Sequence, residues 1–105
     1  RLRGLATSGD KRSHAAPDIP TVAESGIPAY VVTSWFGILA PARTPQEIVG
    51  KLSGALHTAM RSKDLLEKLA GEGAEPAPST PAEFGRLIVS EVETWAKVIK
   101  AAGLQ

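Results

Sequence analysis

Two histidines are the side chains of this sequence best suited to acid–base or metal chemistry. His14 lies in a proline-rich stretch, and His57 lies inside a predicted helix. A zinc-binding helix needs a second ligand on the same face, such as a histidine four residues after the first. That position is occupied by Arg61, which is not a metal ligand. Both histidines are therefore interpreted as surface or boundary residues, and no metal site is predicted.

Catalysis by other means would need a nucleophile beside a base, or two carboxylates that act together. The sequence has no cysteine, which excludes thiolate nucleophiles, disulfides and cysteine-based zinc sites. Glu91 and Glu93 lie close together on a predicted helix, but their side chains point about 200° apart. The glycines also lack the spacing of a phosphate-binding loop. We therefore expect no enzymatic activity and no cofactor.

Ser34 and Trp35 interrupt a segment that is otherwise rich in apolar residues. Two interpretations of this pair stay open. Both side chains could lie in a core with their hydrogen bonds satisfied, as buried serine and tryptophan usually do. Alternatively, they border a cleft, and on that interpretation Ser34 and Trp35 are the candidate ligand-cleft residues.

Charge and length narrow the class of protein further. The sequence has 105 residues, with 12 Lys and Arg against 11 Asp and Glu, and both signs are spread along the chain. A nucleic-acid surface needs a basic face to collect phosphates, so no nucleic-acid partner is predicted. The length suits one compact unit. No apolar run approaches the roughly 20 residues of a membrane span, and no signal peptide opens the chain.

Three Thr-x-x-Glu boxes mark helix starts, because the threonine hydroxyl and the glutamate carboxylate cap each other's backbone amides. They begin at Thr21, Thr44 and Thr80, and proline follows the last two threonines, where its missing N–H costs nothing. Apolar residues then recur at three- and four-residue spacing, and glycines end the runs. The predicted helices cover residues 21–25, 45–61, 63–70 and 81–101.

The segment 30–39 is the best predicted strand. Both of its alternating faces are apolar and rich in β-branched or aromatic residues, which is typical of a strand covered by helices on each side. A weakly alternating segment over 2–7 predicts a second strand. Residues 74–77 are expected to be extended, or to form a short edge strand, because Pro76 and Pro78 would disrupt a central strand. Strands alternating with helices predict an α/β fold.

Several runs of this sequence resemble the Bug (TctC) family of extracytoplasmic solute-binding receptors, which serve tripartite tricarboxylate transporters. The resemblance is carried by Asp18-Ile19-Pro20-Thr21-Val22-Ala23-Glu24-Ser25-Gly26, by Ser34-Trp35-Phe36-Gly37-Ile38-Leu39-Ala40-Pro41, and by Glu83-Phe84, Glu91, Trp95 and Val98 near the end. It spans nearly the whole chain, in order. The sequence corresponds to the last third of such receptors, and its start without methionine suits a piece of a longer protein.

The resemblance implies the C-terminal portion of a type II periplasmic binding protein, a two-lobed α/β fold. Residues 1–29 would be the end of the second lobe and a connector. Residues 30–105 would be the crossover strand and C-terminal helices of the first lobe, and the two parts are expected to form one compact unit. The family's ligand is held mainly by glycine-rich loops earlier in the receptor, which this chain does not contain.

The resemblance also implies a function. It predicts a non-enzymatic, periplasmic receptor piece that takes part in the uptake of a small carboxylate or amino-acid solute and hands it to membrane permease subunits. The alternative is an independently folding interaction module without ligand binding of its own. Such a module could form a homodimer that buries the surface a missing lobe would otherwise cover.

Overall fold

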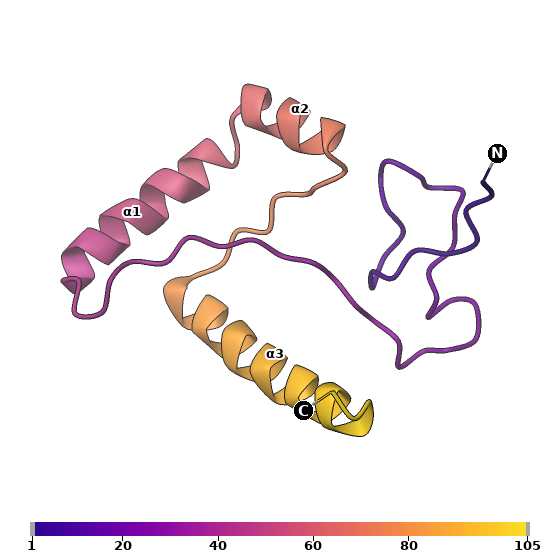
Figure 1. Ribbon diagram of the computed structural model, residues 1–105. Coiled ribbons are helices and arrows are strands. Elements are labelled where there is room, and N and C mark those ends of the chain that lie inside the picture. The colour runs from indigo at the N-terminus through magenta and orange to yellow at the C-terminus, as the bar shows by residue number, and fades with distance from the viewer. Residues whose placement is uncertain (1, 105) are drawn as a thin grey trace. The chain divides into compact units, whose positions relative to one another are not determined.

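A computed structural model describes residues 2–104. It contains three helices: α1 (Gln46–Ala59), α2 (Lys63–Gly71) and α3 (Pro81–Ala101). Figure 1 shows a short link between α1 and α2, a longer irregular segment between α2 and α3, and a long irregular segment before α1. The helix predictions over 45–61, 63–70 and 81–101 are confirmed to within two residues at each end. Helices form reliably here because their hydrogen bonds are local to each segment.

The start of α3 has the predicted capping box. The Glu83 amide donates to Thr80 Oγ1 over 3.2 Å, and the Thr80 amide donates to Glu83 Oε2 over 2.7 Å. Pro81 occupies the first helical position. These bonds satisfy backbone amides that would otherwise lack a partner at a helix start, and they lower the pKa of the Glu83 carboxyl.

The start of α1 differs from the prediction, although the sequence around it is nearly the same. Pro45 is the N-cap residue and makes no side-chain capping bond. The Thr44 hydroxyl instead donates to the carbonyl of Pro41 over 2.8 Å. The preceding turn, where Arg43 has a φ of 69°, therefore takes the hydroxyl that would have capped the helix. The prediction of a capping box formed by Thr44 and Glu47 is therefore wrong.

The ends of α2 and α3 share one arrangement. Gly73 and Gly103 both have positive φ, 68° and 67°. After each, an amide donates back to a helix carbonyl, from Ala74 to Leu69 and from Leu104 to Ile99. This is the Schellman ending, which favours glycine because only glycine adopts positive φ without steric cost. The predicted stop at Gly103 is confirmed, and α2 is closed by Gly73.

The chain divides into two units. The first contains the residues through Ala40 together with Lys63–Glu75, and the second contains Pro41–Ser62 with the residues from Pro76 onward. The second unit includes α1 and α3, linked by a hydrogen bond of 3.0 Å between His57 Nε2 and the Ser79 carbonyl just before α3. His57 is half-buried, so it lies at a boundary, where it holds the start of α3.

The predicted strands at 2–7, 30–39 and 74–77 do not form a ladder among residues 2–104. Only an isolated parallel bridge between Thr7 and Thr21 is present in this range. A strand exists through hydrogen bonds to a neighbour, and these segments are extended without enough neighbours. The predicted helix over 21–25 is also corrected: residues 22–26 form a turn, closed by the bond from the Ser25 amide to the Thr21 carbonyl.

No hydrophobic side chain is buried among the described residues, where Thr21 is the only buried residue, with 1% of its surface exposed. Large apolar side chains remain open in both units, including Phe36 at 96% and Val92 at 65% exposure. Close packing occurs locally. A Cβ added at Gly4 would lie 2.6 Å from Ile19 Cδ1, so alanine at this position would force the isoleucine to move. The fold is therefore held by local hydrogen bonds and not by a core.

The two Thr-Pro-x-Glu starts allow a matched test of capping. Replacing Thr80 with Ala removes the hydroxyl that accepts from the Glu83 amide, so we expect the first turn of α3 to lose about 1 kcal/mol of local stability. Hydrogen exchange at residues 83 and 84 should accelerate by roughly fivefold. The Thr44→Ala variant should leave exchange in the first turn of α1 nearly unchanged, because that hydroxyl bonds to Pro41. Equal effects at both helices would contradict this assignment.

Candidate functional site

A polar hollow of about 330 Å³ lies within the first unit. Three stretches of chain that are distant in sequence contribute to it: an N-terminal loop, the start of the extended segment, and the end of the turn after α2. Its lining residues are Thr7, Ser8, Gly9, Asp10, Lys11, Arg12, Ser13, Val32, Thr33, Ser34, Gly73 and Glu75. Five of these carry hydroxyl groups and four are charged at neutral pH.

Backbone hydrogen bonds hold the first two of these stretches together. The Thr7 amide donates to the Pro20 carbonyl, and the Val22 amide donates to the Thr7 carbonyl, both over 2.9 Å. On the next residue, the Ser8 carbonyl accepts from the Val32 amide over 2.8 Å. Residues 7 and 8 therefore have a neighbouring chain on each side, as a central strand would. This short arrangement places Val32 and the residues after it beside the N-terminal loop.

A cluster of hydrogen bonds around Thr21 fixes the loop that rims the hollow. The Thr21 amide donates to Glu24 Oε2 over 2.8 Å, and the Glu24 amide donates to Thr21 Oγ1 over 3.0 Å. Arg12 Nε then donates to both Glu24 carboxylate oxygens over 3.1 and 3.0 Å. Arg12 Nη1 also donates to the Pro17 carbonyl. The sequence predicted the Thr21–Glu24 box, but nothing in it indicated Arg12 as the partner.

These bonds change the acidity of Glu24. Hydrogen bonding from Arg12, followed by that from the Thr21 amide, lowers the pKa of the Glu24 carboxyl from 4.5 to about 2. Because the pKa of Glu24 is lower in the folded chain than in the unfolded chain, its ionised carboxylate stabilises the fold at pH values above 4.5. This stabilisation is lost as the pH falls from 4.5 through about 2. The loop is therefore expected to keep its shape at neutral pH and to loosen in strong acid.

The other side of the hollow is fixed by a pair that sequence reasoning missed. His14 Nδ1 lies 2.7 Å from Glu75 Oε1, across 61 positions of sequence, and the His14 amide points to the same oxygen. The hydrogen bond from His14 lowers the pKa of the Glu75 carboxyl, and the charge of Lys11 adds to this effect. His14 thus links the loop to residue 75, and its side chain is 89% exposed, which confirms the prediction of a surface residue.

The structure separates the two candidate cleft residues. Ser34 lines the hollow, whereas Trp35 does not and is 40% exposed. Consecutive residues of an extended segment point to opposite faces, so one of the pair can face the hollow while the other faces away. The remaining lining residues of the N-terminal loop had a weak signal in the sequence, the turn residues Ser8-Gly9-Asp10 followed by Lys11. No signal indicated Glu75.

The hollow offers donors to a small anion. Lys11 supplies an ammonium group, and the side chains of Ser8, Thr33 and Ser34 supply hydroxyl donors. Arg12 and Glu75 are already engaged with Glu24 and His14. The Thr7 hydroxyl oxygen is buried and has no hydrogen-bond partner among the described residues. Solvent does not reach that oxygen, so it is not offered to a ligand in this conformation.

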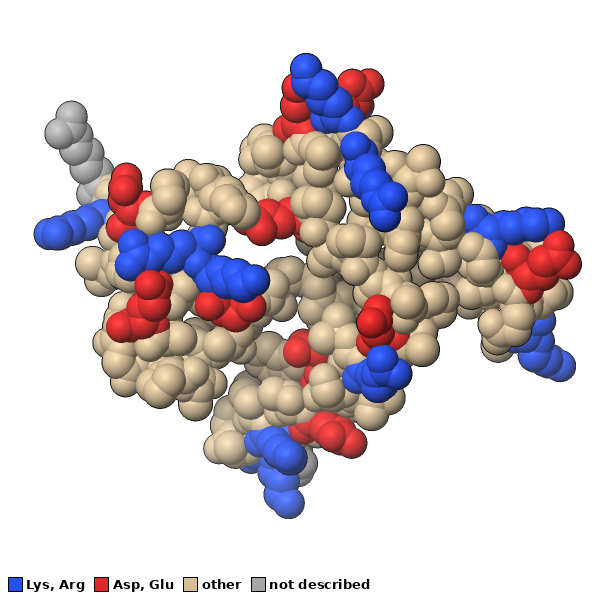
Figure 2. Space-filling view, turned by 180° about the vertical axis from the view of Figure 1, so that it is seen from behind, with Lys and Arg blue, Asp and Glu red and all other residues tan. Residues whose placement is uncertain are grey.

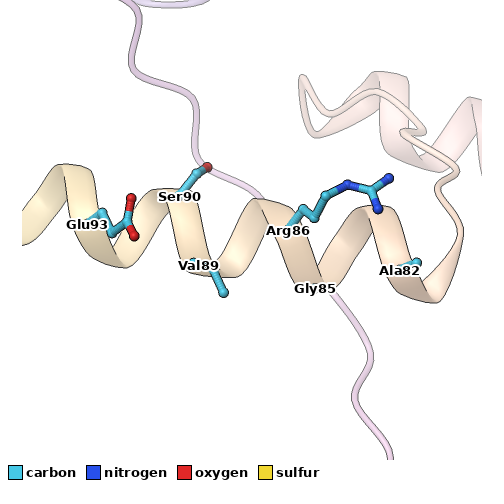
Figure 3. A pocket seen from close by; sticks show the side chains of 6 residues that line it. All are labelled: Ala82, Gly85, Arg86, Val89, Ser90 and Glu93. Carbon is cyan, nitrogen blue, oxygen red and sulfur yellow. The ribbon is translucent and has the colours of Figure 1, made fainter.

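A second depression lies along α3 in the other unit. Figure 3 shows that all six of its lining residues, Ala82, Gly85, Arg86, Val89, Ser90 and Glu93, come from this one helix. No second element encloses them, so the depression is a groove on a helix surface. Gly85 opens it, because no side chain fills the space between the neighbouring turns.

The distribution of charges, the possible metal ligands and the apolarity of the helices bear on other kinds of site among the described residues. Figure 2 shows acidic and basic side chains interspersed on the face in view. Within residues 2–104, no group of three or more His, Cys, Asp or Glu side chains is placed to hold a metal ion. No helix in this range is long and apolar enough to cross a membrane.

Comparison with known proteins identifies the family. Residues 1–104 match the family described as "Tripartite tricarboxylate transporter family receptor". The chain belongs to this receptor family. Among its relatives, Protein BugT of Bordetella pertussis is 36% identical over 102 residues, which are 97% of this chain and 31% of BugT. A UPF0065 protein of Agrobacterium vitis is 38% identical and matches 97% of the chain over 30% of its own length.

A solved receptor structure has the same fold over this region. The structure titled "R. palustris Rpa4515 with adipate" aligns with a TM-score of 0.78 and 38% identity, covering 94% of this chain and 33% of Rpa4515. The predicted class, part of an α/β periplasmic binding protein, is confirmed by this match. The chain therefore spans about a third of the length of its relatives and corresponds to their C-terminal part.

The acidity of Glu24 gives a direct test of the cluster around Thr21. In an Arg12→Gln variant the carboxylate loses its strongest hydrogen-bond donor, so the pKa of Glu24 should rise from about 2 toward 4.5. An NMR titration that follows the Glu24 carboxyl carbon would measure this change. Arg61→Gln serves as the control, because Arg61 lies outside this unit. A Glu24 pKa that stays near 2 in Arg12→Gln would assign the shift to the Thr21 amide instead.

Proposed function

We propose that this chain functions as part of a periplasmic solute-binding receptor that supplies small carboxylates to a tripartite tricarboxylate transporter. The observation that carries the proposal is the match of residues 1–104 to this receptor family. The 38% identity to Rpa4515, solved with adipate, supports a carboxylate as the class of solute. The receptor function requires no catalysis, and its partners are the solute, a carboxylate or amino acid, and the membrane permease subunits.

In the whole receptor, residues 1–29 would belong to the end of the second lobe and its connector, and residues 30–105 to the first lobe. Arg1 and Gln105 lie outside the described residues. On this proposal, the bond from the Val32 amide to the Ser8 carbonyl lies where the chain passes from one lobe to the other. The polar hollow is then part of the surface between the lobes, which is where receptors that close around a solute bind it.

The hollow suits one carboxylate of such a solute. Lys11 offers a charge-assisted hydrogen bond, and Ser34 offers a hydroxyl donor from the adjoining segment. Asp10 would repel the same carboxylate, so the solute is expected nearer to Ser34 than to Asp10. Trp35 does not line this hollow, so the proposal gives the contact with the solute to Ser34.

Solute binding should require more than this chain. The hollow is an open surface, and buried solutes usually lose 70 to 90% of their exposed area or more, which needs walls on several sides. In calorimetry the isolated chain should therefore give no measurable heat with adipate. Micromolar affinity of the isolated chain for any dicarboxylate or amino acid would contradict this expectation.

A chimera provides the complementary experiment. In it, this chain replaces the matched third of Rpa4515. We expect it to bind a dicarboxylate or an amino acid with micromolar affinity in a calorimetric panel that includes adipate. A chimera that unfolds in one cooperative transition, and so is folded, yet binds no member of the panel, would refute the carboxylate proposal.

Ser34 can then be tested inside that chimera. Ser34→Ala removes one donor to a carboxylate, so the dissociation constant should rise by roughly tenfold. Ser90→Ala is the matched control, because Ser90 is an exposed helix residue in the other unit, and it should leave the affinity unchanged. If both variants bind equally well, Ser34 does not touch the solute.

A further inference from the structure

We propose that helix α3 pairs with α3 of a second copy of this chain, side by side and antiparallel, through the side of the helix that carries the groove. This groove side consists of Ala82, Gly85, Arg86, Val89, Ser90 and Glu93. Three observations carry the proposal: the groove side is open, its two charged residues form no ion pair, and their charges match each other when the helix is reversed. The pairing goes beyond the receptor function and does not depend on which solute is bound.

The groove side faces away from the part of α3 that is covered within the chain. Phe84, Ile88 and Glu91 are the half-buried residues of this helix, and at about 100° per residue they lie within about 60° of one another around its axis. Val89, in the middle of the groove side, lies about 140° from Phe84 and is 59% exposed. Packing within the chain therefore leaves the groove side free for a partner.

The two charges of the groove side have opposite signs. Arg86 and Glu93 are seven residues, or about two turns, apart, and Figure 3 shows them projecting from the same side of α3. Neither forms an ion pair with any residue in the range 2–104. The pKa of the Glu83 carboxyl is lowered mainly by hydrogen bonds from Thr80, and the charge of Arg86 adds to this effect. Both charges thus remain available to a partner.

The two charges complement each other on a reversed copy of the helix. In an antiparallel pair whose two-fold axis crosses α3 midway between Arg86 and Glu93, each arginine lies opposite the glutamate of the other copy, because both residues are equally distant from the axis. The same axis places Lys97 opposite Ala82, so like charges do not face each other there. One surface patch therefore supplies both halves of a symmetric contact.

The shape of the groove side allows a second helix to approach closely. A Cβ added at Gly85 would meet nothing within 4 Å, so packing inside the chain does not require glycine, which is less favourable than alanine in a helix interior. The distance between packed helix axes, about 8 to 10 Å, depends on the side chains at the contact, and glycine leaves room for a partner. The Ser90 hydroxyl donates to the Leu87 carbonyl over 3.1 Å, so a partner can cover it without leaving it unpaired.

These features select a second copy as the occupant. A purely acidic or purely basic partner would match one of Arg86 and Glu93 and be repelled by the other. An apolar surface would remove water from both charges without replacing it. A helix with opposite charges two turns apart matches both residues, and α3 is such a helix. Since the contact is a single helix pair, it belongs with the small interfaces of transient complexes.

The test measures self-association of the full 105-residue chain by sedimentation equilibrium at millimolar concentration, where small interfaces are populated. We expect a monomer–dimer equilibrium. Arg86→Glu and Glu93→Arg should each weaken dimerisation by roughly tenfold or more, because attraction becomes repulsion on both sides of the axis. An equal mixture of the two variants should associate nearly as well as the unmodified chain, because opposite charges again face each other.

Two control variants make the same changes in net charge elsewhere. Arg61→Glu and Glu72→Arg alter exposed residues outside α3. They should leave dimerisation unchanged, both alone and when mixed. The controls separate a specific contact from a general effect of net charge on association.

Cross-linking locates the contact on the helix. The sequence has no cysteine, so Val89→Cys introduces a single thiol close to the proposed axis. Val98→Cys places the thiol on the opposite side of α3, nine residues or about two and a half turns away, where the native side chain is 48% exposed. Under mild oxidation the Val89→Cys chains should form disulfide-linked dimers at least roughly tenfold faster, because a disulfide needs the two Cα atoms within about 7 Å.

Four results would overturn the proposal. The first is a chain that stays monomeric at millimolar concentration. The second is an equal loss of association in the α3 variants and in the controls. The third is a mixture of Arg86→Glu and Glu93→Arg that associates no better than either variant alone. The fourth is Val98→Cys chains that link as fast as Val89→Cys chains, which would assign the contact to the other side of α3. These measurements contain no solute, so they are independent of the calorimetry that tests the receptor function.

Discussion

The hydrogen bonds of Thr21 are the interaction on which the first unit depends. Thr21 is the only buried residue among those described, and its amide and hydroxyl are both bonded to Glu24. Arg12 reaches the same carboxylate, while the neighbouring residues Pro20 and Val22 bond to Thr7. One polar centre therefore determines where the N-terminal loop lies, and through Ser8 it also determines where the extended segment begins. Such an arrangement suits a part of a protein that has no apolar core of its own, because hydrogen bonds can be completed locally whereas apolar burial needs a second layer.

The helices form whereas the predicted strands do not, and this difference also depends on which hydrogen bonds can be completed locally. All three helices form, because each satisfies its backbone within a single run of residues. Capping at Thr80 and the Schellman ends at Gly73 and Gly103 are equally local. The segments predicted as strands have the right composition, but among residues 2–104 the single bridge between Thr7 and Thr21 is not extended into a ladder. The TM-score of 0.78 shows that this chain has the fold of the matching third of Rpa4515.

The polar hollow is formed by residues that are far apart in the sequence. Lys11, Ser34 and Glu75 come from three separated stretches of sequence and line one surface. Their positions depend on two tethers, Arg12 with Glu24 and His14 with Glu75, each of which fixes a charged group that would otherwise compete for a ligand. Both tethers are exposed, and exposed polar contacts of this kind individually contribute little to stability. Their role is consequently positional.

The sequence by itself determined the family, the three helices and the Thr21 and Thr80 boxes, because these depend on residue patterns over short distances. It also predicted a strand over 30–39 that is covered on both faces, whereas the structure shows an extended segment with exposed side chains there. Only the tertiary structure decided that Thr44 bonds to Pro41 and leaves α1 uncapped, that His14 meets Glu75 across 61 positions, and that Ser34 but not Trp35 lines the hollow. The first depends on the shape of the turn before α1, and the other two depend on which distant parts of the chain lie close together. That geometry arises from the path of the whole chain and has no counterpart in residue spacing.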